Sequence, residues 1–130
     1  MNKLDRAAKR LAKTVLKHGS VVIRFHQVDN EVELGTVDIA AAPGDGTFEE
    51  ESDGLVQVIE TSDWLIDPQA LIIAGSVIVP SRGDWLAELD SSGVVVEEYA
   101  VAAMAGVPPF EKLSRGYLLR IHSLRRKMSE

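Results

Sequence analysis

Three histidines are the residues of this chain best suited to acid–base or metal chemistry. His18, His26 and His122 stand far apart in the sequence, and two of them fall in segments that we predict to be strands, so we interpret them as ordinary strand or helix-end histidines. The chain has no cysteine, which excludes thiolate metal sites, disulfides and cysteine catalysis. It also lacks a phosphate-binding glycine loop, a G-x-S-x-G segment and an H-E-x-x-H segment. The sequence therefore predicts no catalytic, metal-binding or cofactor-binding residue, and a protein that is not an enzyme.

Carboxylates are the other groups with chemical potential, because hard divalent cations bind to them. Asp63, Asp67 and the run Glu49–Glu51 are candidates, but none has the spacing of a calcium-binding loop, so a solvated acidic segment is the favoured interpretation. Arg82-Gly83-Asp84 matches an integrin-binding tripeptide. We interpret it as a turn ahead of a strand that begins at Trp85.

Charge is divided sharply between the two ends of the chain and its middle. The formal net charge is -6. Residues 1–17 carry six bases and one acid (+5), residues 115–130 carry five bases and one acid (+4), and the middle carries three bases and 18 acids (-15). This separation suits head-to-tail assembly, although local solubility and helix-end electrostatics are an alternative explanation. We predict contacts between protein subunits at four basic residues of the two ends: Lys9, Lys13, Arg125 and Arg126.

The elements that must position these groups are a helix followed by strands. The length of 130 residues fits a single domain, predicted over residues 1–130. Residues 3–18 place apolar side chains at three- and four-residue spacing, which predicts an amphipathic helix ending at Gly19. From Ser20 the spacing changes to two. We therefore predict a mainly β protein, an antiparallel barrel or sandwich over residues 20–124, with the N-terminal helix in residues 1–19 and a basic tail at 125–130.

The alternation predicts six longer strands and a set of core positions. A turn is expected at Asp29-Asn30, and Trp64 and Trp85 are expected to be core residues or interface anchors. The predicted strands are Ser20–Val28, Glu31–Ala40, Leu55–Ile66, Trp85–Leu89, Gly93–Val101 and Gly116–Leu124. The expected core positions include Val22, Ile23 or Phe25, Val58, Leu65, Val96 and Ile121.

Residues 41–54 differ in composition from the rest of the chain. They contain three glycines, one proline and five acids, and Phe48 is their only large apolar side chain. Such a segment buries too little apolar surface to offset the entropy lost on ordering. The composition therefore predicts a long acidic loop that is mobile in the isolated subunit and orders against a neighbour, with Phe48, Glu49, Glu50 and Glu51 as its contact residues.

The order of several short motifs resembles that of a known protein family. An Ala/Leu-rich helix leads through glycine into a strand, as in Leu11–Val22. After a long polar segment comes an Asp-aromatic-Leu-Ile motif, Asp63–Asp67, and then a Pro-x-x-Gly-Asp turn, Pro80–Asp84. A strand of Val, Glu and Tyr, Val95–Val101, precedes a Gly-x-Pro stretch with an aromatic residue, Gly106–Phe110.

The last motif is a strand of the Leu-Arg-Ile-His type, Leu118–Ser123. Together these segments resemble the head–tail joining proteins of tailed bacteriophages, in the head-closure or stopper group, along nearly the whole chain. The resemblance implies a structural component of the virion neck, made in the host cytoplasm, that forms a ring with itself, commonly of twelve copies. It implies contacts with a portal or adaptor protein and with a tail or tail-terminator protein. It also implies a channel through which DNA passes without sequence-specific binding.

Two alternatives stay open at this point. The chain could belong to another layer of the same neck, the mainly helical adaptor or the α/β tail terminator, although it has only one good helix. It could also be a small cellular β-barrel module that binds proteins. No apolar run approaches the length of about 18 residues that a membrane span needs, so no membrane partner is expected.

Overall fold

The computed structural model describes residues 2–127, and it describes residues 18 and 19 by their backbone alone. Helix α1 (Lys3–Gly19) begins after Asn2, whose side chain accepts a hydrogen bond of 2.8 Å from the backbone N–H of Asp5. Ala12 is the most deeply buried residue on the face of α1 that packs against the barrel. The predicted N-terminal helix is confirmed.

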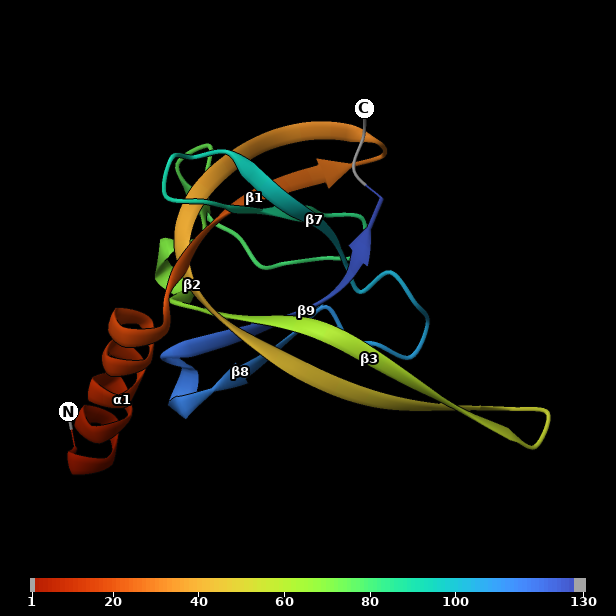
Figure 1. The fold of residues 1–130 in the computed structure, drawn as a ribbon. Helices are drawn as coiled ribbons and strands as arrows, with labels where there is room; N and C mark the ends of the chain where they lie inside the picture. The colour runs from red at the N-terminus through yellow and green to blue at the C-terminus, as the bar shows by residue number, and fades with distance from the viewer. Residues whose placement is uncertain (1, 128–130) are drawn as a thin grey trace.

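Six antiparallel strands form a closed barrel behind this helix (Figure 1). Around the barrel they follow the order β3-β2-β1-β6-β7-β9, and pairing of β3 with β9 closes the sheet. This arrangement confirms the predicted mainly β fold. The bounds of the six strands are β1 (Val21–Asp29), β2 (Val32–Ser52), β3 (Leu55–Ile66), β6 (Trp85–Leu89), β7 (Val95–Val101) and β9 (Leu118–Arg126).

Short strands and two 3-10 helices lie outside the six-stranded barrel. Strand β8 (Phe110–Leu113), which the sequence analysis did not predict, pairs with the first half of β9. The segment between β3 and β6 contains the 3-10 helix η1 (Pro68–Ala70) and a two-residue hairpin of β4 (Ile72–Ile73) and β5 (Ser76–Val77). A second 3-10 helix, η2 (Ser114–Gly116), lies against α1.

The barrel interior is filled by alternate residues of the strands. Ile23, Phe25 and Ile121 are fully buried, as predicted, and Trp64 is a core residue. The prediction was wrong for three valines: Val22, Val58 and Val96 are 43%, 57% and 48% exposed. Val22 is adjacent to the inward-facing Ile23 and therefore points outward, and Val58 lies where β3 has left the barrel. Leu65 is half-buried.

The predicted acidic loop is a strand, and this is the largest correction to the sequence analysis. Residues 42–52 pair one for one with residues 65–55, and only Asp53 and Gly54 form the turn, both with positive φ. Across the ladder the three consecutive glutamates face the uncharged residues Val58, Gln57 and Val56, so no like charges oppose each other there. The backbone hydrogen bonds of the ladder order a segment whose side chains alone could not. Hydrogen exchange of the isolated subunit distinguishes this ordered ladder from the predicted mobility.

Part of this hairpin projects beyond the barrel. Strand β2 pairs with β1 only as far as Ala41, and β3 pairs with β9 only from Ser62 onward. Residues 46–61 therefore pair only with each other, and we call them the ribbon (Figure 1). Seven residues in each strand, 46–52 and 55–61, give the ribbon a length of about 23 Å. Pro43 stands where one edge of β2 becomes free, a position in which a sheet accommodates proline.

Two further expectations about segment ends need correction. The first hairpin turn lies at Asn30-Glu31, one residue later than predicted, and both residues have positive φ. Arg125 and Arg126 do not begin a tail, because they are the last two residues of β9 and pair with Tyr99 and Glu98 of β7. The remainder of the predicted tail after Lys127 lies outside the described residues.

We expect the barrel interior and the ribbon to respond differently to mutation. Ile121→Ala should lower the free energy of unfolding by about 2–5 kcal/mol, because it leaves a cavity in the core. Val58→Thr, on the exposed ribbon, should change it by about 0.5 kcal/mol or less. Denaturant unfolding of both variants measures the difference, and equal losses would contradict the assignment of core and ribbon.

Candidate functional site

A cluster of buried charged groups lies where the ribbon leaves the barrel. Asp63 of β3 and His122 of β9 face each other across the seam that closes the sheet, and both are almost fully buried. The His122 Nδ1 lies 3.0 Å from Oδ1 of Asp63, and its Nε2 lies 2.8 Å from Oε1 of Glu111 on β8. With a carboxylate at each ring nitrogen, both nitrogens can donate only when the imidazole is protonated, so these contacts favour its cationic form.

Two more side chains complete the cluster around Asp63. The Thr61 hydroxyl donates to Oδ1 of Asp63 at 2.6 Å. The Arg120 Nε lies 2.9 Å from Oδ2, but its N–H is not directed at that oxygen, so the contact is an ion pair without a hydrogen bond. The Asp63 carboxylate is thus surrounded by two cations and one hydroxyl.

The electrostatic consequence is opposite for the two central groups. For Asp63, burial raises the pKa, but hydrogen bonds from His122 and Thr61 and the charges of His122 and Arg120 outweigh burial and lower it. For His122, burial lowers the pKa, but hydrogen bonds to Asp63 and Glu111 and their charges outweigh burial and raise it. Each group therefore stabilises the charged form of the other.

The same cluster fixes the base of the ribbon. The ring of Phe48 meets the ring of His122 edge to face, with centroids 4.9 Å apart. Gly46 has no room for a side chain, because a Cβ there would lie 2.5 Å from Oδ2 of Asp63 and 2.4 Å from the hydroxyl oxygen of Thr61. Residues of β2, β3, β8 and β9 thus meet at one point, and the ribbon leaves the barrel from a packed and charged base.

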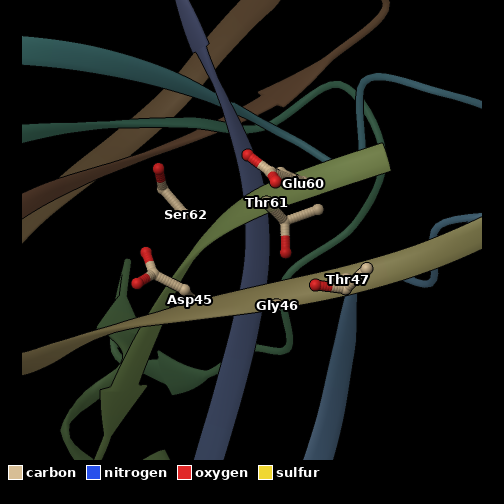
Figure 2. Close-up of a pocket in the computed structure, with 6 residues that line it drawn as sticks. All are labelled: Asp45, Gly46, Thr47, Glu60, Thr61 and Ser62. Atoms are coloured by element: carbon tan, nitrogen blue, oxygen red, sulfur yellow. The ribbon is translucent and has the colours of Figure 1, made fainter. Parts of the chain in front are cut away.

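An open pocket of about 380 Å³ lies at this base (Figure 2). Its walls come from β2 and β3, and all but one of the lining residues carry side-chain oxygens. The lining residues are Asp45, Gly46, Thr47, Glu60, Thr61 and Ser62. Both ring nitrogens of His122 are engaged by carboxylates. Within residues 2–127, no group of three or more His, Asp and Glu side chains is arranged to hold a metal ion.

A second cluster covers the outside of the barrel near the end of β9. The rings of His26 and Trp85 stack with centroids 3.5 Å apart, and the Arg126 guanidinium carbon lies 4.0 Å from the centre of the Trp85 ring. Arg126 also forms an ion pair of 3.0 Å with Glu98. Trp85 is thus half-buried at the surface, and its predicted role as an interface anchor stays a prediction.

The Arg82-Gly83-Asp84 segment is a structural turn, as its position suggested. The Asp84 carboxylate is buried and accepts hydrogen bonds of 2.9 Å from the backbone N–H groups of Val28 and Ser81. The Arg82 guanidinium donates to backbone carbonyls of residues 102, 104 and 107 and so holds the loop after β7. Neither charged group is presented to a partner in the way that an adhesion motif requires.

Comparison of the sequence with models of known families shows to which family the chain belongs. The family model of the phage head-tail joining protein matches residues 1–130. The chain belongs to this family. It matches no curated protein. Members of the head-tail joining family are structural proteins of the phage virion and interact with other head and tail proteins, in agreement with the resemblance read from the sequence.

The predicted interface residues of this head-tail joining protein lie in separate places. Lys9 and Lys13 are exposed on α1 beside an open pocket of about 220 Å³, and Glu49–Glu51 lie on the ribbon. Phe48 is half-buried at the ribbon base. Arg125 and Arg126 pair with Glu97 and Glu98 of the same chain, although the Arg125 side chain is 74% exposed. The role of all these residues as contacts stays a prediction.

The part of the chain described here contains no helix that is long and apolar enough to cross a membrane.

The cluster around His122 was missed because its members are distant in sequence. Asp63 and His122 are 59 residues apart, and only closure of the barrel makes them neighbours. Alternation gave no signal for them, because Thr61 and Asp63 lie on the strand face opposite the core residues Trp64 and Ile66.

We expect the stability of the protein to depend on pH through this cluster. The raised pKa of His122 means that its contribution is complete below the unfolded value of about 6.5 and is lost as the pH rises through the folded value. The lowered pKa of Asp63 means that its contribution is complete above about 3.9 and is lost as the pH falls through the folded value. The free energy of unfolding should therefore decline from about pH 6.5 toward pH 9.

Denaturant unfolding across this range measures the decline, and His122→Gln should remove most of it. An NMR titration of the wild-type ring gives a check that does not depend on the variant folding. A His122 resonance that titrates below the value of a free histidine would contradict the assignment.

A matched pair of glycine substitutions tests the packing at the ribbon base. Gly46→Ala should destabilise the protein by about 1–3 kcal/mol, because the new Cβ collides with Asp63 and Thr61. Gly44→Ala should be tolerated, since its Cβ would meet only the end of the Arg120 side chain, at 3.5 Å. Thermal unfolding of the two variants compares them, and equal stability would show that the base is not tightly packed.

Proposed function

We propose that this head-tail joining protein is the head-closure, or stopper, component of the neck. In this role several copies, twelve by the family resemblance, form a ring between the portal and the tail after synthesis in the host cytoplasm. The ring continues the DNA channel and offers the surface to which the tail attaches. The observation that best supports this role is a closed barrel with a ribbon of about 23 Å on one side and a basic helix on the other (Figure 1).

The charge distribution supports a channel through which DNA slides. Residues 18–114 carry 18 acids and three bases, a net charge of -15. A wall with this charge repels the phosphate backbone and so disfavours adhesion of the passing DNA. In this arrangement DNA is a transported polymer and not a sequence-specific ligand.

The contacts of the ring and its neighbours are proposed at the exposed ends of these elements. Lys9 and Lys13 on α1, Glu49–Glu51 on the ribbon and Arg125 at the end of β9 are the charged contact residues. Phe48 and Arg126 support these contacts from within the chain, because Phe48 packs on His122 and Arg126 packs on Trp85. Each exposed pair adds only about 0.2–1 kcal/mol, but a ring repeats it at every interface.

The element content separates this role from the other neck layers. An adaptor would be mainly helical, and a tail terminator would pack several helices on a sheet. Within residues 2–127 there is one α-helix beside a closed barrel, which favours the head-closure layer. Membership of the head-tail joining family argues against a cellular binding module.

A null mutation in the phage that encodes this protein tests the proposal. We expect DNA-filled heads and complete tails that do not join, and heads that lose their DNA because the channel is not closed. Purified protein should restore joining, whereas Lys9→Glu with Lys13→Glu should restore it poorly while melting at the wild-type temperature, because both side chains are exposed.

Electron microscopy of the particles and counts of infectious phage give the result. Tails of uncontrolled length in the null mutant would place the protein in the terminator layer and overturn the proposal. Normal joining without the protein would exclude a role in the neck.

A further inference from the structure

Part of the apolar stripe on α1 is exposed in the part of the chain that the structure describes. Ala12 is buried against the barrel, whereas Leu4 and Leu11 are 66% and 55% exposed and Ala7 is exposed between them. Residues three, four and seven apart lie on one side of a helix, so these three side chains form a continuous exposed line. Exposure of two neighbouring leucine side chains is unfavourable, because burial of their apolar surface would lower the free energy.

Basic side chains border this exposed line. Lys3 and Arg10 flank Ala7 at an open pocket of about 230 Å³, which Arg6 also lines. Within residues 2–127, neither Lys3 nor Arg10 forms an ion pair with an acid of the same chain. The surface formed by Leu4, Ala7, Leu11, Lys3 and Arg10, which we call the helix face, is therefore apolar at its centre and positive at its edge.

The ribbon carries a surface of the opposite charge and the same apolar character. Val56 faces Glu51 across the ladder, and Val58 faces Glu49, so these four side chains lie on one face of the ribbon. Both valines are exposed, at 62% and 57%, and Leu55 is 75% exposed at the turn. Glu49 and Glu51 form no ion pair among the described residues. This ribbon face is apolar and negative, and it therefore complements the helix face.

The two faces lie at opposite sides of one subunit (Figure 1). Helix α1 lies on one side of the barrel, and the ribbon points away from it on the other side. A ribbon therefore cannot fold back onto the helix of its own chain. A contact between two different patches of identical subunits is head-to-tail, and repetition of such a contact with a suitable rotation closes a ring.

We propose that the ribbon face of one subunit docks on the helix face of the next copy of this chain. The inference rests on the proposed ring and specifies the contact that builds it. Val56 and Val58 pack on Leu4 and Leu11, while Glu49 and Glu51 approach Lys3 and Arg10. The apolar side chains supply the stabilisation, and the charges set orientation and exclude other registers. DNA is not the occupant of the ribbon face, since phosphates are repelled by its glutamates and gain nothing from its valines.

The absence of native cysteine allows a direct test by cross-linking. Leu11→Cys and Val56→Cys are prepared as separate proteins, mixed, bound to tailless DNA-filled heads and treated with a short bis-maleimide. We expect a cross-linked dimer from the mixture, and a ladder of multimers from the chain that carries both substitutions. A mixture of Val56→Cys with Val94→Cys is the matched control, because Val94 is 60% exposed but lies on the β6–β7 side of the barrel. This control should give no dimer.

Charge exchange gives a second, independent readout. Glu49→Lys with Glu51→Lys should weaken association, by up to about fivefold for each reversed contact, and so should Lys3→Glu with Arg10→Glu. Combining all four substitutions in one chain should recover most of the loss. Asp29→Lys with Glu31→Lys makes the same charge change on the first hairpin turn and should not be rescued by the helix substitutions.

The outcomes separate this inference from the proposed function. Protein that binds the heads in several copies but gives no cross-link between positions 11 and 56 overturns the docking and leaves the ring intact. Equal cross-linking in the Val94 control also overturns it. Protein that fails to bind the heads at all contradicts the proposed function itself.

Discussion

The pairing of β3 with β9 closes the sheet, and Asp63 meets His122 near the end of that seam from which the ribbon leaves. A buried carboxylate and a buried imidazolium are each costly alone, so removing either one leaves an unpaired charge and destabilises the seam. Glu111 and Arg120 neutralise the pair from β8 and β9, and Thr61 satisfies a further lone pair of Asp63. A shifted register of β3 against β9 would separate Asp63 from His122 and leave a buried charge unpaired, so shifted registers are disfavoured.

The ribbon depends on this seam for its direction. Residues 62–66 of β3 pair with both β2 and β9, whereas residues 55–61 of β3 pair with β2 alone. An isolated two-stranded hairpin is marginal in water, so the packed contacts at its base are needed to hold it in one orientation. Phe48 on His122 and the close approach of Gly46 to Asp63 supply those contacts. The joining protein thus has a projecting two-stranded arm where its composition predicted a loop.

Sequence alone predicted the barrel well where side chains alternate cleanly. The strands at 55–66 and 85–89 have the predicted bounds, and Ile23, Phe25 and Ile121 are in the core. The prediction from sequence failed where a segment with the composition of a loop is paired as a strand. Residues 41–54 have the composition of a loop, but their order comes from backbone hydrogen bonds to β3, which composition does not register. The core prediction failed at Val22 and Val96, because both faces of those strands carry apolar residues.

The candidate site was harder to predict than the fold, since its residues become neighbours only when β3 pairs with β9 and closes the barrel. His122, Asp63 and Glu111 come from three strands, and the sequence gives no spacing that links them. By contrast, the separation of charge between the ends and the middle was visible from the start. It keeps its meaning in the fold, where the basic helix and the acidic ribbon point in opposite directions (Figure 1).

Hydrogen exchange of the isolated subunit tests the central claim, a ribbon that is ordered by its own ladder and anchored at the seam. The ladder amides of residues 44–51 and 56–61 should be protected, most strongly next to Asp63 and less toward the turn at Asp53-Gly54. Exchange of all these amides at the rate of an unfolded chain, while the barrel strands stay protected, would show that the segment is a mobile loop and would contradict this account.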